Sequence, residues 1–169
     1  MKCLECDGVM KARKEAFRYD ACGLPGVTLV GVTVSRCPDC GEVEVTIPQI
    51  EKLHRAIAET LARKRKRLMP QEVRFLRKWL GLSGVDFADL MGVTPETVSR
   101  WEQGATPMGL VAERLLRCFV LTREPESEYR LEAFKGVGVD RAAPVKIGLK
   151  LMNGLWRSQS RVPVAAAVR

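Results

Sequence analysis

Two Cys-x2-Cys pairs constrain this chain more than any other feature of its sequence. Cys3 and Cys6 form the first pair, Cys37 and Cys40 form the second, and a glycine follows each pair closely. A structural zinc site takes a closed tetrahedron of ligands, with thiolates at about 2.3 Å, and a Cys-x2-Cys turn places two sulfurs on one side of it. We therefore predict that these four cysteines bind one structural zinc ion (Zn2+), which leaves no open position for a substrate.

Two alternatives for the cysteines are a redox pair and isolated buried thiols. A thioredoxin-like redox motif needs one pair beside a βαβ unit, whereas this chain has two pairs and no such pattern. Disulfides are not expected for a cytosolic chain, because the cytosol keeps thiols reduced. We expect Cys22 to be a half-buried or solvent-facing thiol in a turn, and Cys118 to be a small core residue.

The segment between and after the two pairs is rich in β-branched residues. Residues 16–19, 27–34 and 42–47 are predicted to be strands of a small antiparallel sheet. Together they define a zinc-binding domain over residues 1–48. A domain of this size buries too little apolar surface to fold by burial alone, so the metal is expected to supply much of its folding free energy.

Residues 49–69 are predicted to form an amphipathic basic connector helix. Pro48 suits a helix start, the apolar residues recur at a spacing of three and four, and the segment carries a formal net charge of +5. Five consecutive cations close it: Arg63, Lys64, Arg65, Lys66 and Arg67. They are interpreted either as a solvated basic face or as phosphate contacts, and a neighbouring DNA-binding motif favours phosphate. His54 is expected at the surface.

Residues 70–121 show four helical segments, separated by the capping and turn residues that are typical of a helix-turn-helix domain. A helix over 70–80 is followed by one that Ser83 can cap, and Gly92 and Val93 form a turn. Thr94 then caps a third helix that has Pro95 at its first position. The fourth helix, residues 110–121, holds more apolar surface than a small domain needs to bury, which suggests a dimer seam.

The stretch LSGVDFADLMGVTPETVSRWEQG, residues 82–104, resembles the Xre/Cro-type helix-turn-helix. Together with the cysteine pairs, residues 1–121 resemble the MqsA-type antitoxins, also called the YgiT-type zinc finger and helix-turn-helix family. The resemblance implies a homodimer that binds a palindromic operator in double-stranded DNA through its C-terminal domain. It also implies a zinc domain that binds a protein toxin, often a ribonuclease.

The resemblance places the base-reading positions of the third helix on Glu96, Thr97 and Arg100. Arg100 is the strongest candidate, because a guanidinium bound to guanine O6 and N7 gives about 1–3 kcal/mol of discrimination. The candidates for phosphate contacts are Ser83, Thr94, Ser99 and Gln103. The chain departs from the family at Gly84, where a glutamine is common, and in the zero net charge of residues 70–121.

The sequence therefore predicts an α+β protein, with a small zinc-bound antiparallel β domain followed by an all-α helix-turn-helix domain. Residues 122–169 are expected to be a partly disordered C-terminal extension, either solvated or a DNA-binding arm. The predicted function is a transcription repressor that serves as the antitoxin of a toxin-antitoxin operon; the alternative is a stand-alone regulator of the same architecture.

An enzyme is not expected, because the sequence offers neither a His/Glu metal constellation nor a paired nucleophile and base. No uncharged apolar run approaches the roughly 20 residues that cross a bilayer, and the first residues lack the apolar core of a signal peptide. We therefore expect a cytoplasmic protein with no membrane contact.

Overall fold

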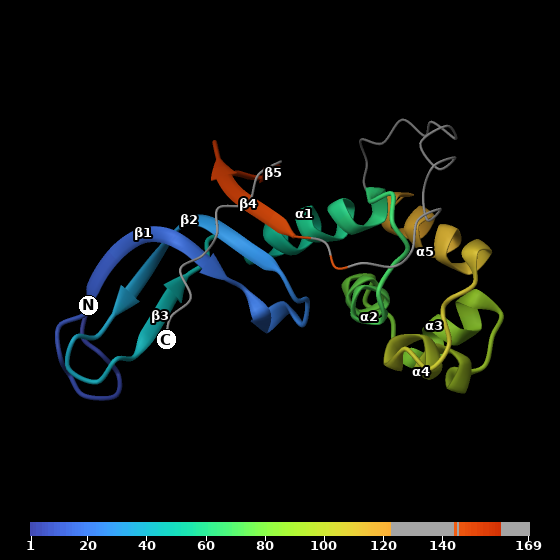
Figure 1. Ribbon diagram of the computed structural model, residues 1–169, viewed down its shortest axis with the longest axis horizontal. Helices are drawn as coiled ribbons and strands as arrows, with labels where there is room; N and C mark the ends of the chain where they lie inside the picture. Colours follow the sequence, from blue (N-terminus) through green and yellow to red (C-terminus); the bar gives the residue numbers. More distant parts are fainter. Residues whose placement is uncertain (123–143, 145, 160–169) are drawn as a thin grey trace.

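The structure is a computed structural model, and it describes residues 1–122, 144 and 146–159. A twisted sheet forms one half of the molecule, a group of helices forms the other, and α1 (Ile50–Arg63) lies between them (Figure 1). This arrangement confirms the predicted α+β class. None of the described helices is both long enough and apolar enough to cross a membrane.

The sheet is built around β2 (Val27–Arg36), its longest strand. β1 (Lys11–Arg18) runs antiparallel to it along one edge. The other edge of β2 is shared: β3 (Val43–Thr46) pairs antiparallel with residues 33–36, and β4 (Ile147–Met152) pairs parallel with residues 27–30. β5 (Leu155–Gln159) completes the sheet order β1-β2-β4-β5, and a short 3-10 turn, η1 (Asp20–Cys22), links β1 to β2.

The β4–β5 hairpin differs from the expected C-terminal extension. Asn153 and Gly154 have φ values of 51° and 75°, the left-handed conformations of a tight two-residue hairpin turn. Ile147 and Leu149 are buried, and the Trp156 Nε1 donates to the Pro48 carbonyl over 3.1 Å. The sheet is therefore mixed and extends beyond residues 1–48. The expected disordered end falls mostly on residues 160–169, which lie outside the described residues.

Helix α1 is a core element of the fold and not only a connector. Its inward face is fully buried against the sheet on one side and against α2 and α5 on the other, through Leu53, Ile57, Ala58, Leu61 and Ala62. Its limits differ from the prediction. Gln49, in a left-handed conformation, precedes the first helical residue, so Pro48 lies outside the helix, and the helix ends at Arg63 before most of the basic run.

Four helices form the second half: α2 (Pro70–Trp79), α3 (Gly84–Met91), α4 (Pro95–Gln103) and α5 (Leu110–Thr122). One continuous apolar core runs from the sheet through α1 into these helices. His54 links the two halves, because its Nε2 lies 3.1 Å from the Tyr19 hydroxyl and its ring meets Phe75 edge-on. The expected surface position of His54 was therefore wrong: burial lowers the pKa of this half-buried ring.

Candidate metal centre and nucleic-acid interface

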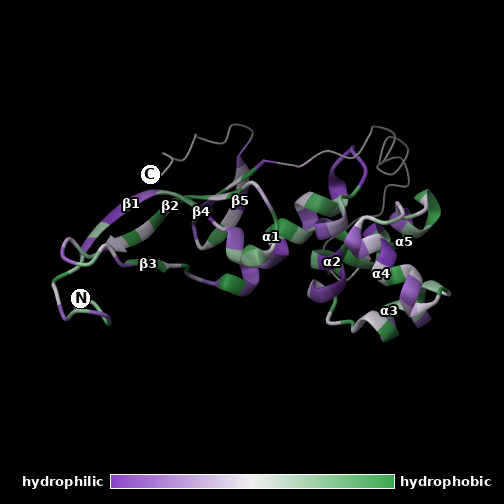
Figure 2. Cartoon of the chain, turned by 60° about the horizontal axis from the view of Figure 1, so that its bottom comes forward, coloured by the Kyte–Doolittle hydropathy of each residue, from purple (hydrophilic) through white to green (hydrophobic). Residues whose placement is uncertain are grey.

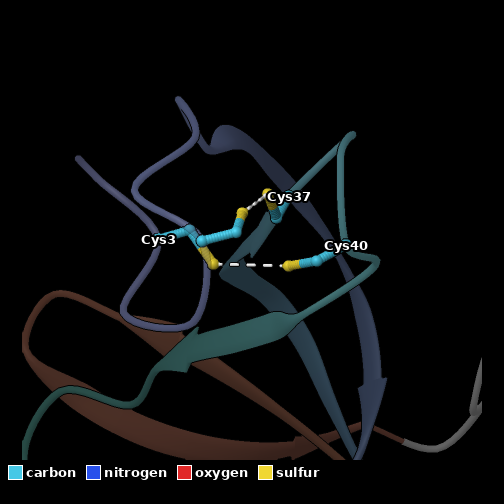
Figure 3. A group of neighbouring side chains, drawn as sticks. Cys3, Cys37 and Cys40 are labelled. Atoms are coloured by element: carbon cyan, nitrogen blue, oxygen red, sulfur yellow. Dashed lines mark hydrogen bonds between the residues drawn. The ribbon is translucent and has the colours of Figure 1, made fainter.

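The four paired cysteines meet at the end of the sheet remote from the helices. Their Sγ atoms all lie within 4.8 Å of one another. Cys3 Sγ lies 3.5 Å from Cys40 Sγ, and Cys6 Sγ lies 3.4 Å from Cys37 Sγ (Figure 3). Thiolates at about 2.3 Å from a tetrahedral ion are about 3.8 Å apart. The sulfur spacing therefore fits one ion bound by all four residues.

The two cysteine turns have the same backbone geometry. The amide of the first cysteine in each turn donates to the carbonyl five residues later: Cys3 to Gly8 over 2.8 Å and Cys37 to Glu42 over 2.9 Å. The residue four positions after that cysteine donates back to its carbonyl and has a positive φ, 57° at Asp7 and 79° at Gly41. Each turn thus presents its two sulfurs in the same way, as two halves of one tetrahedron.

Backbone donors in the second turn favour the thiolate form of one of the four sulfurs, that of Cys37. Backbone N–H groups of Cys40 and Asp39 approach the Cys37 sulfur and lower the pKa of that thiol to about 7, which favours the thiolate that a metal binds. A Cβ at Gly8 would lie 3.3 Å from the same sulfur and would clash with Asp39 Oδ2, so this position is tightly enclosed. Cys22 is half-buried and donates to the Tyr19 carbonyl, outside the cluster.

The helices α3 and α4 form the second candidate site. Ser83 caps α3 by accepting from the Asp86 amide over 3.1 Å, and Thr94 caps α4 by accepting from the Thr97 amide over 3.3 Å. Gly92, with φ 65°, ends α3 and starts the turn between the two helices. These are the caps and the turn that the sequence predicted.

The outward face of α4 carries the residues that the sequence singled out. Glu96, Ser99, Arg100 and Gln103 are exposed and Thr97 is half-exposed, while Val98 and Trp101 are buried on the opposite face. Gln103 Nε2 donates to Ser99 Oγ over 3.0 Å, so these two phosphate candidates form one polar pair.

A partly buried ion pair that sequence reasoning missed fixes α4 against α2. Arg77 binds Glu102 through two nitrogens, Nε at 2.5 Å and Nη2 at 3.0 Å, and its Nη1 donates to the Leu82 carbonyl. Arg74 Nε lies 3.5 Å from Glu102 Oε2, the oxygen that Arg77 Nη2 also binds. Only charge complementarity between the two helices could have suggested this pairing.

A second buried network holds the segment that follows α1. Arg117 on α5 is fully buried and donates to the carbonyls of Ala62, Lys64 and Lys66 at 3.2, 2.6 and 2.8 Å. It also binds Glu113 over 2.6 Å. Arg117 therefore caps the carboxyl end of α1, which explains why the helix stops inside the basic run.

The same network separates the five basic residues that the sequence proposed for phosphate contacts into partly buried and exposed ones. Lys64 pairs with Glu72 in a buried ion pair, and Arg67 Nε donates to Glu113 over 2.6 Å. Arg63, Arg65 and Lys66 are exposed, with Arg63 4.0 Å from Glu59. Two of the five cations thus form ion pairs with carboxylates of the same chain, and the other three lie at the surface.

The fold and the sites together define a class of protein: a β domain with a cluster of four thiols that could hold a metal ion, joined to a small helical domain. The model of the family described as the antitoxin component of bacterial toxin-antitoxin systems, MqsA, matches residues 1–130, and the chain belongs to this family. The β4–β5 hairpin lies beyond the matched region. A comparison with curated proteins gives no match.

Proposed function

We propose that the protein is a sequence-specific transcription repressor, the antitoxin of a toxin-antitoxin operon, which acts in the cytoplasm. In this proposal α3 and α4 form a helix-turn-helix that binds a palindromic operator in the operon's own promoter, and the metal domain neutralises the toxin. The observation that carries the DNA-binding part is the polar outward face of α4. The burial of Trp101 and the Arg77–Glu102 pair support this proposal, because they hold α4 on its inner side and leave its polar face exposed for docking into a major groove.

The contacts divide into base readers and phosphate contacts. Arg100 is the base reader with the greatest expected effect, with Glu96 and Thr97 beside it on the same helix. Ser83, Thr94, Ser99 and Gln103 supply polar contacts to phosphates. From the basic run we now assign phosphate contacts to Arg63, Arg65 and Lys66 only, since Lys64 and Arg67 already bind carboxylates.

We propose zinc as the metal. Four thiolates without a histidine or carboxylate suit zinc in a closed structural site, where the ion contributes folding free energy and takes no part in a reaction. We also propose a homodimer through the C-terminal helical domain. Val111 and Leu115 on α5 support it, because they leave apolar surface exposed that a second copy would cover.

The DNA-binding proposal is tested by titrating the zinc-loaded protein against its own promoter. Arg100→Ala should raise the Kd for the operator about 5- to 150-fold and relax the preference at one base pair. Replacing Arg65 and Lys66 by alanine should weaken binding to all sequences. It should also make log K fall less steeply with log salt, with the magnitude of the slope reduced by about two. Lys52→Ala, an exposed cation near the start of α1, is the control and should change neither property.

The toxin-linked part needs a second titration, in which the product of the adjacent gene is added. Promoter binding altered by that product supports an antitoxin. Specific promoter binding that is indifferent to it leaves a stand-alone regulator of the same architecture. Failure to bind the promoter at all would refute the assignment of α3 and α4 as a DNA-binding element.

A further inference from the structure

We propose that a basic groove on the metal domain is the surface that binds an acidic face of the toxin. The groove has a volume of about 220 Å³ and lies on one face of the β1–β2 pair beside the second cysteine turn, lined by Lys11, Arg13, Glu15, Val34, Arg36 and Pro38. We call it the β1 groove. This inference rests on the proposed antitoxin function and specifies the chemistry of the partner.

Strand register places the basic residues on one face. Lys11 pairs with Arg36 and Arg13 pairs with Val34 across the β1–β2 ladder, and residues directly opposite each other project from the same side of a sheet. Lys14 lies between these positions along the strand and therefore projects from the other side. The β1 groove thus gathers cations that the linear sequence spreads over more than twenty positions.

The charges in the β1 groove are unbalanced. It holds three cations and a single carboxylate, Glu15, which pairs with Arg36 Nη2. Arg36 Nη1 is buried and has no hydrogen-bond partner among the described residues. Within the described part of the chain, Lys11 and Arg13 are exposed and form no ion pair. Lys11 and Arg13 are the exposed cations that an incoming group can reach, so the groove is suited to carboxylates supplied from outside.

The position of the β1 groove favours a protein partner over DNA. The groove adjoins the cysteine cluster, because Pro38 in its lining lies between Cys37 and Cys40. Figure 1 shows α3 and α4 at the end of the molecule opposite the start of β1. Figure 2 shows β1 as largely hydrophilic, and the exposed Pro38 adds one apolar side chain to the groove. Cations beside an apolar side chain match a protein surface with carboxylates at its rim better than a phosphate backbone.

The test measures binding of the full-length, zinc-loaded chain to the purified product of the adjacent gene. Reversing two charges with Lys11→Glu and Arg13→Glu should raise the Kd at least about tenfold, mainly through a slower association rate, and weaken the salt dependence of that rate. Lys14→Glu is the matched control, since it reverses one charge on the same strand but on the opposite face. It should change the Kd by less than about twofold.

Each outcome decides a different point. The neutral variant Lys11→Gln, Arg13→Gln should give an effect between the wild type and the reversal, with unchanged zinc content showing that the domain is folded. Equal effects of Lys14→Glu and the double reversal, or no effect of either, would overturn the β1 groove while leaving the antitoxin function intact. Loss of promoter affinity with toxin affinity unchanged would assign the groove to nucleic acid. A wild-type chain that binds no product of the adjacent gene would refute both.

Discussion

Arg117→Leu gives the sharpest test of how the two halves of the molecule are joined. The change removes the side chain that caps the carbonyls of Ala62, Lys64 and Lys66, and it leaves Glu113 buried with Arg67 as its remaining cation. Removing one partner of a buried ion pair costs about 3–5 kcal/mol. We expect a loss in the free energy of unfolding within that range, because Arg67 compensates only part of the charge on Glu113.

The measurement is urea unfolding followed by circular dichroism, with zinc in fixed excess. The free energy of unfolding of Arg117→Lys should fall between those of the wild type and the leucine variant. An ammonium keeps the charge but cannot span several carbonyls as a planar guanidinium does. Lys78→Leu, at an exposed position of α2, should change the free energy of unfolding by no more than about 0.5 kcal/mol. A loss below about 1 kcal/mol for Arg117→Leu would refute the capping role of Arg117.

Three further predictions concern the links within the sheet half. Because burial lowers the pKa of His54, the folded state binds fewer protons there than the unfolded state; its contribution to stability should be present above about pH 6.5 and be lost as pH falls below it. The difference in melting temperature between the wild type and His54→Gln should therefore shrink or reverse as the pH falls through that range. A difference in melting temperature that stays constant would contradict a lowered pKa of His54 in the folded state. Trp156→Phe removes the hydrogen bond to the Pro48 carbonyl and should cost about 0.5–1.5 kcal/mol in urea unfolding; an unchanged midpoint would argue against that bond. Cys37→Ser, or treatment with a chelator, should abolish stoichiometric zinc binding and lower the midpoint of thermal unfolding, as measured by metal analysis and far-ultraviolet circular dichroism; an unchanged midpoint after loss of the metal would mean that the metal centre is dispensable for stability.

The sequence determined the features that depend on short-range spacing. A Cys-x2-Cys turn brings its own two sulfurs together, so each cysteine pair followed from its positions, whereas the meeting of the two pairs depends on the pairing of β1 and β3 with β2. The caps at Ser83 and Thr94 followed for the same reason, since a capping side chain bonds to an amide three residues away.

The C-terminal hairpin has a local signal in the sequence. Asn153 and Gly154 between two alternating segments are the strongest short-range indication of a hairpin. Their presence predicts β4 and β5 but not the partner of β4. That partner is residues 27–30 of β2, more than one hundred positions away, and only burial of Ile147 and Leu149 against α1 and the sheet selects it.

The tertiary structure alone decided what the basic run does. In the sequence, residues 63–67 are five equivalent cations, because composition records charge but not the carboxylates that meet it. Folding brings Glu72 to Lys64 and Glu113 to Arg67, and it directs Arg117 to the end of α1. Ion pairs between distant residues depend on the packing of whole helices, so no local pattern predicts which charges remain free to bind a partner.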